Sequence, residues 1–261
     1  MALRTCSLCF AGLCLLLAWV PPLPGEQPNQ LTSAERAAGF RLLFDGKSFN
    51  GWKQQGNWTI VEQALYSGRG GGGLTCVAKQ IPDDFELRFQ WKVARGSNSG
   101  VYYRPGQYEY QILDNAVHID GKNPRTSAAS LYFCMAPSRD VTRPVGKWND
   151  GRIVCQGSII QHWLNGQKVI DFDYTDKRWS QPVALLKKRG GTLSARGRAL
   201  FLQDHGDPVW YRTIRLRTIP KEETIPHQTV QPALIPPEIR KAEEEKLRRI
   251  IENRRRQKAA P

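Results

Sequence analysis

Hydrophobic and polar residues alternate in short runs along most of this chain. The clearest run is residues 85–93 (FELRFQWKV), where every second side chain is aromatic or aliphatic. Side chains alternate across a β-strand, so this run predicts a strand with one buried face. A second run, HWLNGQKV, turns on Asn165-Gly166. Since Asn-Gly suits a type I′ turn, this run predicts a β-hairpin.

The same strand pattern continues through the body of the chain, with frequent turn residues and no long amphipathic helix. The other predicted strands are residues 58–66, 74–78, 101–104, 107–112, 129–133, 152–155, 159–164, 167–172, 198–203 and 209–217. Many short strands of this kind predict an all-β antiparallel sandwich of the jelly-roll type. Before the body, residues 27–39 read as a polar lead-in with one helical turn capped by Thr32 or Ser33.

Residues 98–115 predict the central hairpin, with its turn at Pro105-Gly106. With a two-residue loop, the facing pairs are Arg104 with Gln107, Tyr102 with Glu109, and Gly100 with Gln111. One face would then be apolar, and the other would carry hydrogen-bonding groups together with one anion and one cation. Beside Asn98, such a face is suited to holding polyols. An ordinary solvent-exposed sheet face is the alternative.

The N-terminal segment resembles a secretory signal peptide, with Arg4, an apolar run over 8–20, and a cleavage site expected after Gly25. The run is shorter than the roughly 20 apolar residues of a membrane span, so we expect residues 1–25 to be removed. The mature protein is then secreted or periplasmic, without a transmembrane segment. It keeps Cys76, Cys134 and Cys155, which leaves open either one disulfide with one buried thiol or three buried thiols.

The C-terminal segment changes in composition. Residues 220–237 form a Pro-rich linker or strap, and residues 238–261 form a charged, basic helical tail whose apolar stripe is narrow. A narrow stripe favours a solvated tail that is dispensable for catalysis. The formal net charge of the chain is +14. For an exported protein we interpret this charge as serving solubility or contact with an anionic cell envelope, rather than nucleic-acid binding.

Several chemical classes of site are disfavoured by spacing. No Cys or His spacing resembles a zinc site, so we expect neither metal nor cofactor. The Gly-rich stretch 67–73 is followed by a strand instead of a helix, which argues against a dinucleotide site. Glu109 and Asp114 lie five residues apart on one strand, which places them roughly 16 Å apart on opposite faces. They therefore cannot act as the carboxylate pair of an ordinary glycosidase.

Two residues are candidates for a general base. Glu109 would be kept ionised by Arg104 in the expected register, and the alternative for these two residues is a purely structural cross-strand ion pair. His205 follows Gln203-Asp204 where a strand ends in a turn, a position suited to proton transfer near neutral pH. Trp148 and Tyr132 could supply a stacking wall, or belong to the core.

Six motifs occur in one order: GFRLLFDGKSFNGW, NSGVYYR, YEYQILDN, PVGKWND, the LNG hairpin and LFLQDHGDPVWYRTIRL. Together they resemble the 3-keto-disaccharide hydrolase domain family, whose fold is the concanavalin A-like lectin/glucanase jelly roll, over residues 39–219. The chain departs from the family pattern at two places. Ala128-Ala129-Ser130 stands where the pattern often reads small-Gly-small, and Thr213 stands where the pattern often has Asn.

The resemblance implies an exported enzyme that cleaves 3-keto-disaccharides or 3-keto-glycosides. A base removes the C2 proton, the C1 substituent leaves by elimination, and water adds back. Glu109 or His205 would be the base, and Arg104 would stabilise the enolate. The expected substrate contacts are Asn98, Tyr102, Gln111, Asp114, Tyr132, Trp148 and Gln203. A non-catalytic carbohydrate-binding module on the same fold is the alternative.

Overall fold

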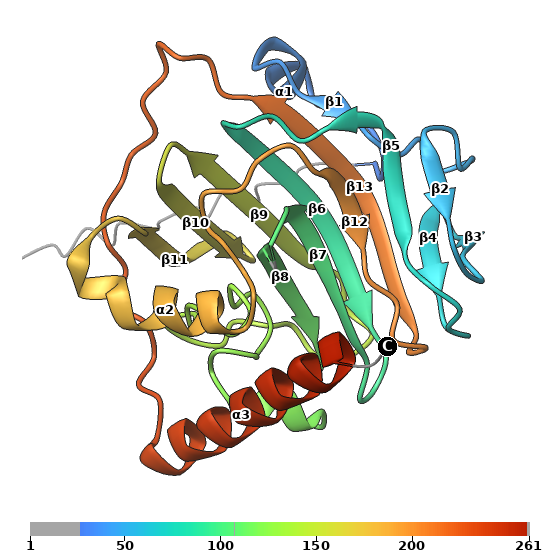
Figure 1. Ribbon diagram of the computed structural model, residues 1–261. Helices are drawn as coiled ribbons and strands as arrows, with labels where there is room; N and C mark the ends of the chain where they lie inside the picture. Colours follow the sequence, from blue (N-terminus) through green and yellow to red (C-terminus); the bar gives the residue numbers. More distant parts are fainter. Residues whose placement is uncertain (1–26, 107, 260–261) are drawn as a thin grey trace, which may run out of the picture.

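Two antiparallel sheets packed face to face form the body of the protein (Figure 1). The computed structural model describes residues 27–106 and 108–259, so the predicted signal peptide and Gln107 lie outside the described residues. In the eight-stranded sheet the order is β11 (Gln167–Asp173), β10 (Ile159–Leu164), β9 (Asn149–Gln156), β6 (Phe85–Val93), β13 (Val209–Thr218), β4 (Ala64–Ser67) and β3 (Thr59–Val61), with β1 (Arg41–Leu42) paired to β13.

The five-stranded sheet has the order β2 (Trp52–Gln54), β5 (Leu74–Gln80), β12 (Ala199–Leu202), β7 (Asn98–Arg104) and β8 (Tyr108–Leu113). The core lies between the two sheets. The rings of Phe85 and Phe89 on β6 pack at 5.9 Å from Tyr103 and 5.3 Å from Tyr110, centroid to centroid. The predicted antiparallel jelly-roll sandwich is confirmed.

Most local signals were correct, but three elements differ from prediction. Residues 58–66 are two strands, because Glu62 and Gln63 both take positive φ angles and turn the chain. Residues 129–133 are turns that lie along β8, with an isolated bridge between Leu131 and Tyr110 in place of a regular strand. Residues 180–188, for which no element was predicted, form helix α2 (Ser180–Lys188).

Two short elements follow their predicted chemistry. Helix α1 (Ser33–Ala37) is capped by Thr32, whose hydroxyl accepts from the Glu35 amide while the Glu35 carboxylate accepts from the Thr32 amide. The hairpin at Asn165-Gly166 turns with φ angles of 50° and 79°, as a type I′ turn requires. Short 3₁₀ turns, η1 (Ile119–Lys122) and η2 (Lys177–Trp179), complete the connections.

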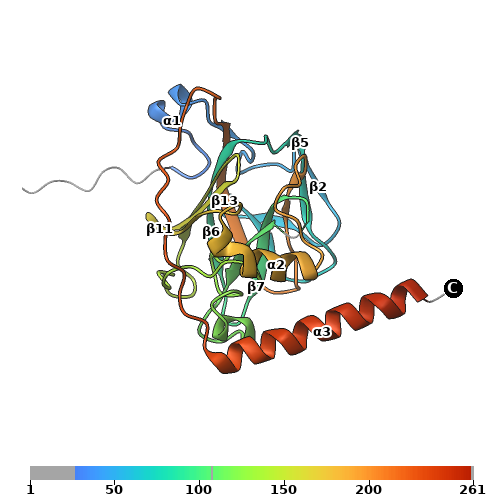
Figure 2. The ribbon, with the colours of Figure 1, turned by 60° about the vertical axis from the view of Figure 1, so that its left-hand side comes forward.

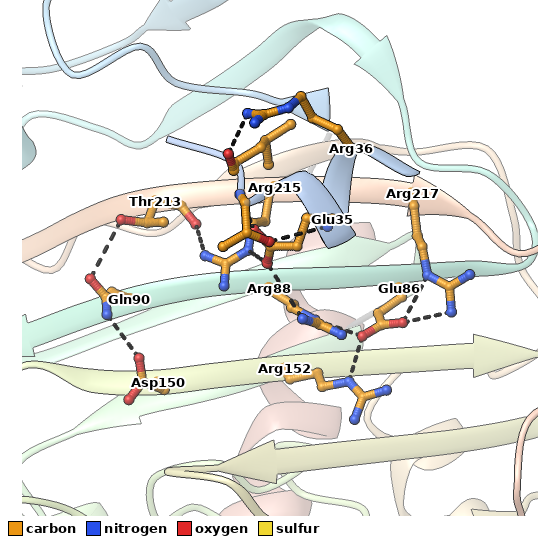
Figure 3. Close-up of polar contacts among 12 residues, drawn as sticks. Glu35, Arg36, Glu86, Arg88, Gln90, Asp150, Arg152, Thr213, Arg215 and Arg217 are labelled. Atoms are coloured by element: carbon orange, nitrogen blue, oxygen red, sulfur yellow. Dashed lines mark hydrogen bonds and ion pairs between the residues drawn. The ribbon is translucent and has the colours of Figure 1, made fainter. Parts of the chain in front are cut away.

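A network of carboxylates and guanidinium groups covers part of the outward face of the eight-stranded sheet (Figure 3). Glu86 on β6 is 1% exposed and accepts from Arg88, Arg152 and Arg217 at 2.7, 2.6 and 2.9 Å. Burial by itself raises the pKa of Glu86, but Arg152 and Arg88 outweigh it and hold the pKa below its ordinary value. Glu35 ion-pairs with Arg88, which joins α1 to the same network.

The chain after β13 runs along the sandwich as a strap before the last helix begins. Ile225 is buried against Val154, and the amides of Val230 and Ala233 donate to the carbonyls of Asp171 and Pro137. Helix α3 (Pro237–Ala259) then crosses the front of the molecule beside β8 and below α2 (Figure 1). Its C-terminal half projects beyond the body (Figure 2).

The expectation of a solvated tail is wrong for the first half of α3. Leu247 is 6% exposed and packs against Tyr132 and Phe133, and Glu243 is 4% exposed. The apolar stripe of α3 is narrow, as the sequence indicated, but it packs against the small apolar patch formed by Tyr132 and Phe133. Ion pairs of Glu243 and Lys246 flank this contact. Within the described ranges, no helix is long and apolar enough to cross a membrane. Cys76, Cys134 and Cys155 are three buried free thiols.

A stability prediction follows from Ala128-Ala129-Ser130, where the chain departs from the small-Gly-small pattern of the family. Ala129 has φ 64°, the left-handed region that glycine adopts without strain. We expect Ala129→Gly to leave the free energy of unfolding unchanged or raised. The control Ala128→Gly, without a positive φ, should lower it by roughly 0.5–1 kcal/mol. Denaturant titration of both variants checks this, and equal destabilisation by the two would contradict it.

Candidate active site

The central hairpin presents its polar face on the outside of the five-stranded sheet. Tyr102 pairs with Glu109 and Gly100 pairs with Gln111, as predicted. The alternate residues, among them Val101 and Tyr110, belong to the core between the sheets. The period-two pattern therefore identified the outward polar face correctly, except at the turn.

Arg104 does not lie on that face. The register shifts between Tyr102 and Arg104, so that Arg104 pairs with Tyr108 and the predicted pairing with Gln107 is wrong. Its side chain is 1% exposed, lies over the rings of Phe85 and Tyr108 at 5.7 and 5.6 Å, and donates to the Asp83 carbonyl. A bulge turns a strand, and here it turns this cation away from Glu109.

The carboxylate of Glu109 is the centre of the site. Its side chain is 2% exposed, and Oε2 accepts from the Tyr102 hydroxyl at 2.7 Å. With its amide nitrogen directed at the two facing oxygen atoms, Gln111 donates to Glu109 Oε1 at 2.9 Å and to the Ser99 carbonyl at 3.0 Å. Burial raises the pKa of Glu109 to about 7, although the Tyr102 hydrogen bond and Arg189 lower it. Glu109 is thus poised to exchange a proton near neutral pH.

Tyr102 acts as a fixed donor to this carboxylate. Burial, and then the charge of Glu109, raise the pKa of the Tyr102 hydroxyl well above its ordinary value. The Gln203 amide donates to the same hydroxyl at 3.3 Å, and Phe201 packs edge-on against the Tyr102 ring at 5.8 Å. The predicted contacts Tyr102, Gln111 and Gln203 are therefore brought together around Glu109.

Three charged residues near Glu109 come from distant segments. Arg189, after α2, lies 4.4 Å above the Tyr132 ring, and its Nη1 is buried without a hydrogen-bond partner among the described residues. Lys246 of α3 donates to Asp120 at 3.2 Å and to the Tyr132 hydroxyl at 3.4 Å. No local pattern marked Asp120 or Lys246. Arg189 directly follows the basic pair Lys187-Lys188, so a basic stretch is the one sequence signal near any of the three.

A second line of hydrogen bonds joins the hairpin to η1. The amide of Asn98 lies 3.2 Å from Gln111 and 3.4 Å from His118 Nε2. His118 Nδ1 accepts from the backbone N–H of Asp120 at 3.1 Å. The predicted residue Asn98 thus belongs to the site, and His118 is a member that the sequence did not indicate.

The remaining predicted residues have other surroundings. His205 is exposed in the turn between β12 and β13, while its neighbour Asp204 accepts from Ser67 and Gly72. Trp148 lies on the outer face of the other sheet, under Arg212 at 4.0 Å and Lys92 at 5.0 Å. Asp114 accepts from the amides of Gly96 and Ala116 and so holds the turn after β8. None of these contacts involves Glu109.

Tyr132, one of the predicted substrate contacts, lies beside Glu109. Its hydroxyl lies 3.2 Å from Asp120 Oδ2, and its amide donates to the Glu109 carbonyl at 3.1 Å. Across residues 27–106 and 108–259, no group of three or more His, Cys, Asp or Glu side chains is placed to hold a metal ion. The arrangement offers a proton acceptor, neutral hydroxyl and amide donors, and two cations.

Comparisons with known proteins agree on one family. A family model described as a 3-keto-alpha-glucoside-1,2-lyase-like domain matches residues 39–217. The chain is 30% identical over 246 residues to a 3-keto-disaccharide hydrolase of Bacteroides thetaiotaomicron, covering 76% of this chain and 84% of that protein.

Solved structures show the same fold. A candidate glycosyl hydrolase from Parabacteroides distasonis superposes with a TM-score of 0.64 at 24% identity, covering 74% of this chain and 100% of its own. A second one from that organism gives 0.54 at 23% identity, covering 69% and 99%.

The position of Gly100 makes a prediction for the site. A Cβ atom there would lie 2.2 Å from Glu109 Oε1, so Gly100→Ala must displace the carboxylate from Tyr102. We expect a loss of at least about tenfold in kcat/KM on a 3-keto-disaccharide, because a small misplacement of a catalytic group is costly. The melting temperature should fall little. Unchanged kcat/KM would show that Glu109 does not need this position.

Proposed function

This chain belongs to the 3-keto-α-glucoside-1,2-lyase-like family, and we propose that it cleaves 3-keto-disaccharides or related 3-keto-glycosides with Glu109 as the base. Membership makes it an enzyme of the hydrolase or lyase type. The observation that carries the proposal is the buried Glu109 carboxylate, held by Tyr102 and Gln111 with a pKa raised by burial to about 7.

The proposed reaction begins at the acidic C2–H beside the C3 ketone. Glu109 takes this proton, and the electron pair forms the C2–C3 double bond of an enolate with its charge on the C3 oxygen. When the C3 carbonyl re-forms, a C1–C2 double bond forms and the C1–O bond breaks, so the leaving alkoxide departs and takes up a proton. Water then adds its oxygen to C1 and a proton returns to C2, which gives the free 3-keto sugar.

Such a reaction needs stabilisation of the enolate more than a second carboxylate. Arg189 supplies positive charge beside Glu109, in the role that the sequence gave to Arg104. A cation placed in advance where charge develops lowers the barrier without reorganisation. The hydroxyls of Tyr102 and Tyr132 and the amides of Asn98 and Gln203 are suited to hold sugar hydroxyls.

The ionisation of Glu109 sets the expected pH dependence. The base must be deprotonated, so kcat/KM should rise through a pH of about 7 and level off above it. Glu109→Gln should remove at least about a hundredfold of the rate, the usual contribution of a positioned base. Release of the leaving group from a 3-keto-glucoside between pH 5 and 9 measures both effects.

His205→Ala is the matched comparison, because His205 is the other base that the sequence suggested. Its exposed position predicts wild-type turnover in that variant. Loss of turnover in His205→Ala with activity kept in Glu109→Gln would assign the base to His205. A non-catalytic carbohydrate-binding module would instead bind the sugar in all three proteins and turn over none.

We further propose that the protein is exported, on the support of Arg4, the apolar run over 8–20 and the Pro-rich stretch 21–25 that follows it. Expression of the full chain in a host with a secretory pathway should yield a mature form that begins after Gly25. Fractionation with N-terminal sequencing checks this, and an uncleaved cytosolic product would contradict it. Contact of the basic end of α3 with an anionic envelope stays a prediction.

A further inference from the structure

One face of helix α3 packs against residues 120–133, the segment that covers Glu109. Glu243, Lys246 and Leu247 lie at i, i+3 and i+4, so their side chains share a side of the helix. Glu243 ion-pairs with Arg125 at 2.5 Å and accepts from the Asn123 amide at 2.8 Å. Leu247 is buried against Tyr132 and Phe133.

Lys246 is the residue on this face that points at the site. Its Nζ lies 3.2 Å from Asp120 Oδ1 and 3.4 Å from the Tyr132 hydroxyl, while that hydroxyl lies 3.2 Å from Asp120 Oδ2. Tyr132 is in turn bonded through its amide to the Glu109 carbonyl. Lysine, tyrosine and aspartate thus form a closed triangle next to the proposed base.

The charges around Glu109 show what this triangle contributes. The titratable groups whose charges act on Glu109 or on its donor Tyr102 come from several elements: Tyr211 from β13, Tyr132, Asp120 from η1, Arg189, Arg198 and Lys246. Arg198 lies 5.3 Å from the centre of the Tyr102 ring. Asp120 is the one anion in this set and opposes ionisation of Glu109. Lys246 is the cation paired with Asp120, and the two charges therefore act on Glu109 in opposite directions.

We propose that helix α3 is part of the active site, with Lys246 as a positioning residue that holds Tyr132 and compensates Asp120 beside Glu109. This inference rests on the proposed role of Glu109 as the base. A tail that the sequence suggested to be dispensable then becomes a component of catalysis. It acts at the C-terminal end of a chain whose other site residues lie between 98 and 203.

The test follows the acid limb of the pH dependence of kcat/KM in the full-length protein, on a 3-keto-glucoside at low ionic strength. Lys246→Met leaves Asp120 uncompensated, so Glu109 keeps its proton to higher pH and the limb moves up by about half a pH unit or more. Asp120→Asn removes the anion, so the limb moves down. The double variant should return close to the wild type.

Two further variants separate this role from helix packing. Lys246→Arg keeps the cation and should restore the wild-type limb. Arg256→Gln removes a cation from the exposed distal turns of the same helix and should leave the limb in place. If Lys246→Met folds poorly, Asp120→Asn and Lys246→Arg still test the compensation.

The proposal is overturned if the acid limb of Lys246→Met coincides with that of the wild type. It is also overturned if the acid limb of the double variant stays where that of Lys246→Met lies. A lower melting temperature alone would show that Lys246 only fastens the helix. Failure of the proposed function looks different, because Glu109→Gln would then keep its turnover or the wild type would show no acid limb.

Discussion

Desolvation of the Glu109 carboxylate is the constraint on which the site depends. A buried carboxylate is costly unless donors replace its water, and here a tyrosine and an amide do so from the adjacent positions of one hairpin. The remaining cost appears as the raised pKa. Because the folded protein binds this proton more tightly than an unfolded chain with its ordinary pKa of 4.5, protonated Glu109 stabilises the fold below that pH. The stabilisation is lost as the pH rises through about 7.

The same hairpin serves two purposes because its strands are buried on both faces. Every residue of β7 and β8 is buried, which is unusual for an antiparallel sheet with an outer face. On the inner side, tyrosine and aliphatic side chains join the two sheets. On the outer side, the loop carrying Tyr132, the end of α2, and α3 cover the polar groups. The rigid core thereby fixes the geometry of donors that a solvated sheet face would leave mobile.

Sequence reasoning reached those features that depend on neighbouring residues. The period of two in residues 101–112 was enough to place Tyr102 opposite Glu109 and to separate the polar face from the core. It failed at Arg104, because whether Pro105-Gly106 closes a tight loop or a bulged one depends on packing against Phe85 and Tyr108. Tertiary packing alone brings Arg189, Asp120 and Lys246 close to Glu109. Their spacing along the chain therefore could not predict that they share a site.

The contact between Asn123 and Glu243 spans 120 residues of sequence, and this has a consequence for the order of assembly. Contacts of such separation form late, since a long loop must close before they stabilise anything. During synthesis the strands of the sandwich leave the ribosome before α3 does. A nascent chain can therefore bury its core while its reactive centre is still open to water. The proposed site is complete only when Lys246 and Leu247 have packed beside Tyr132.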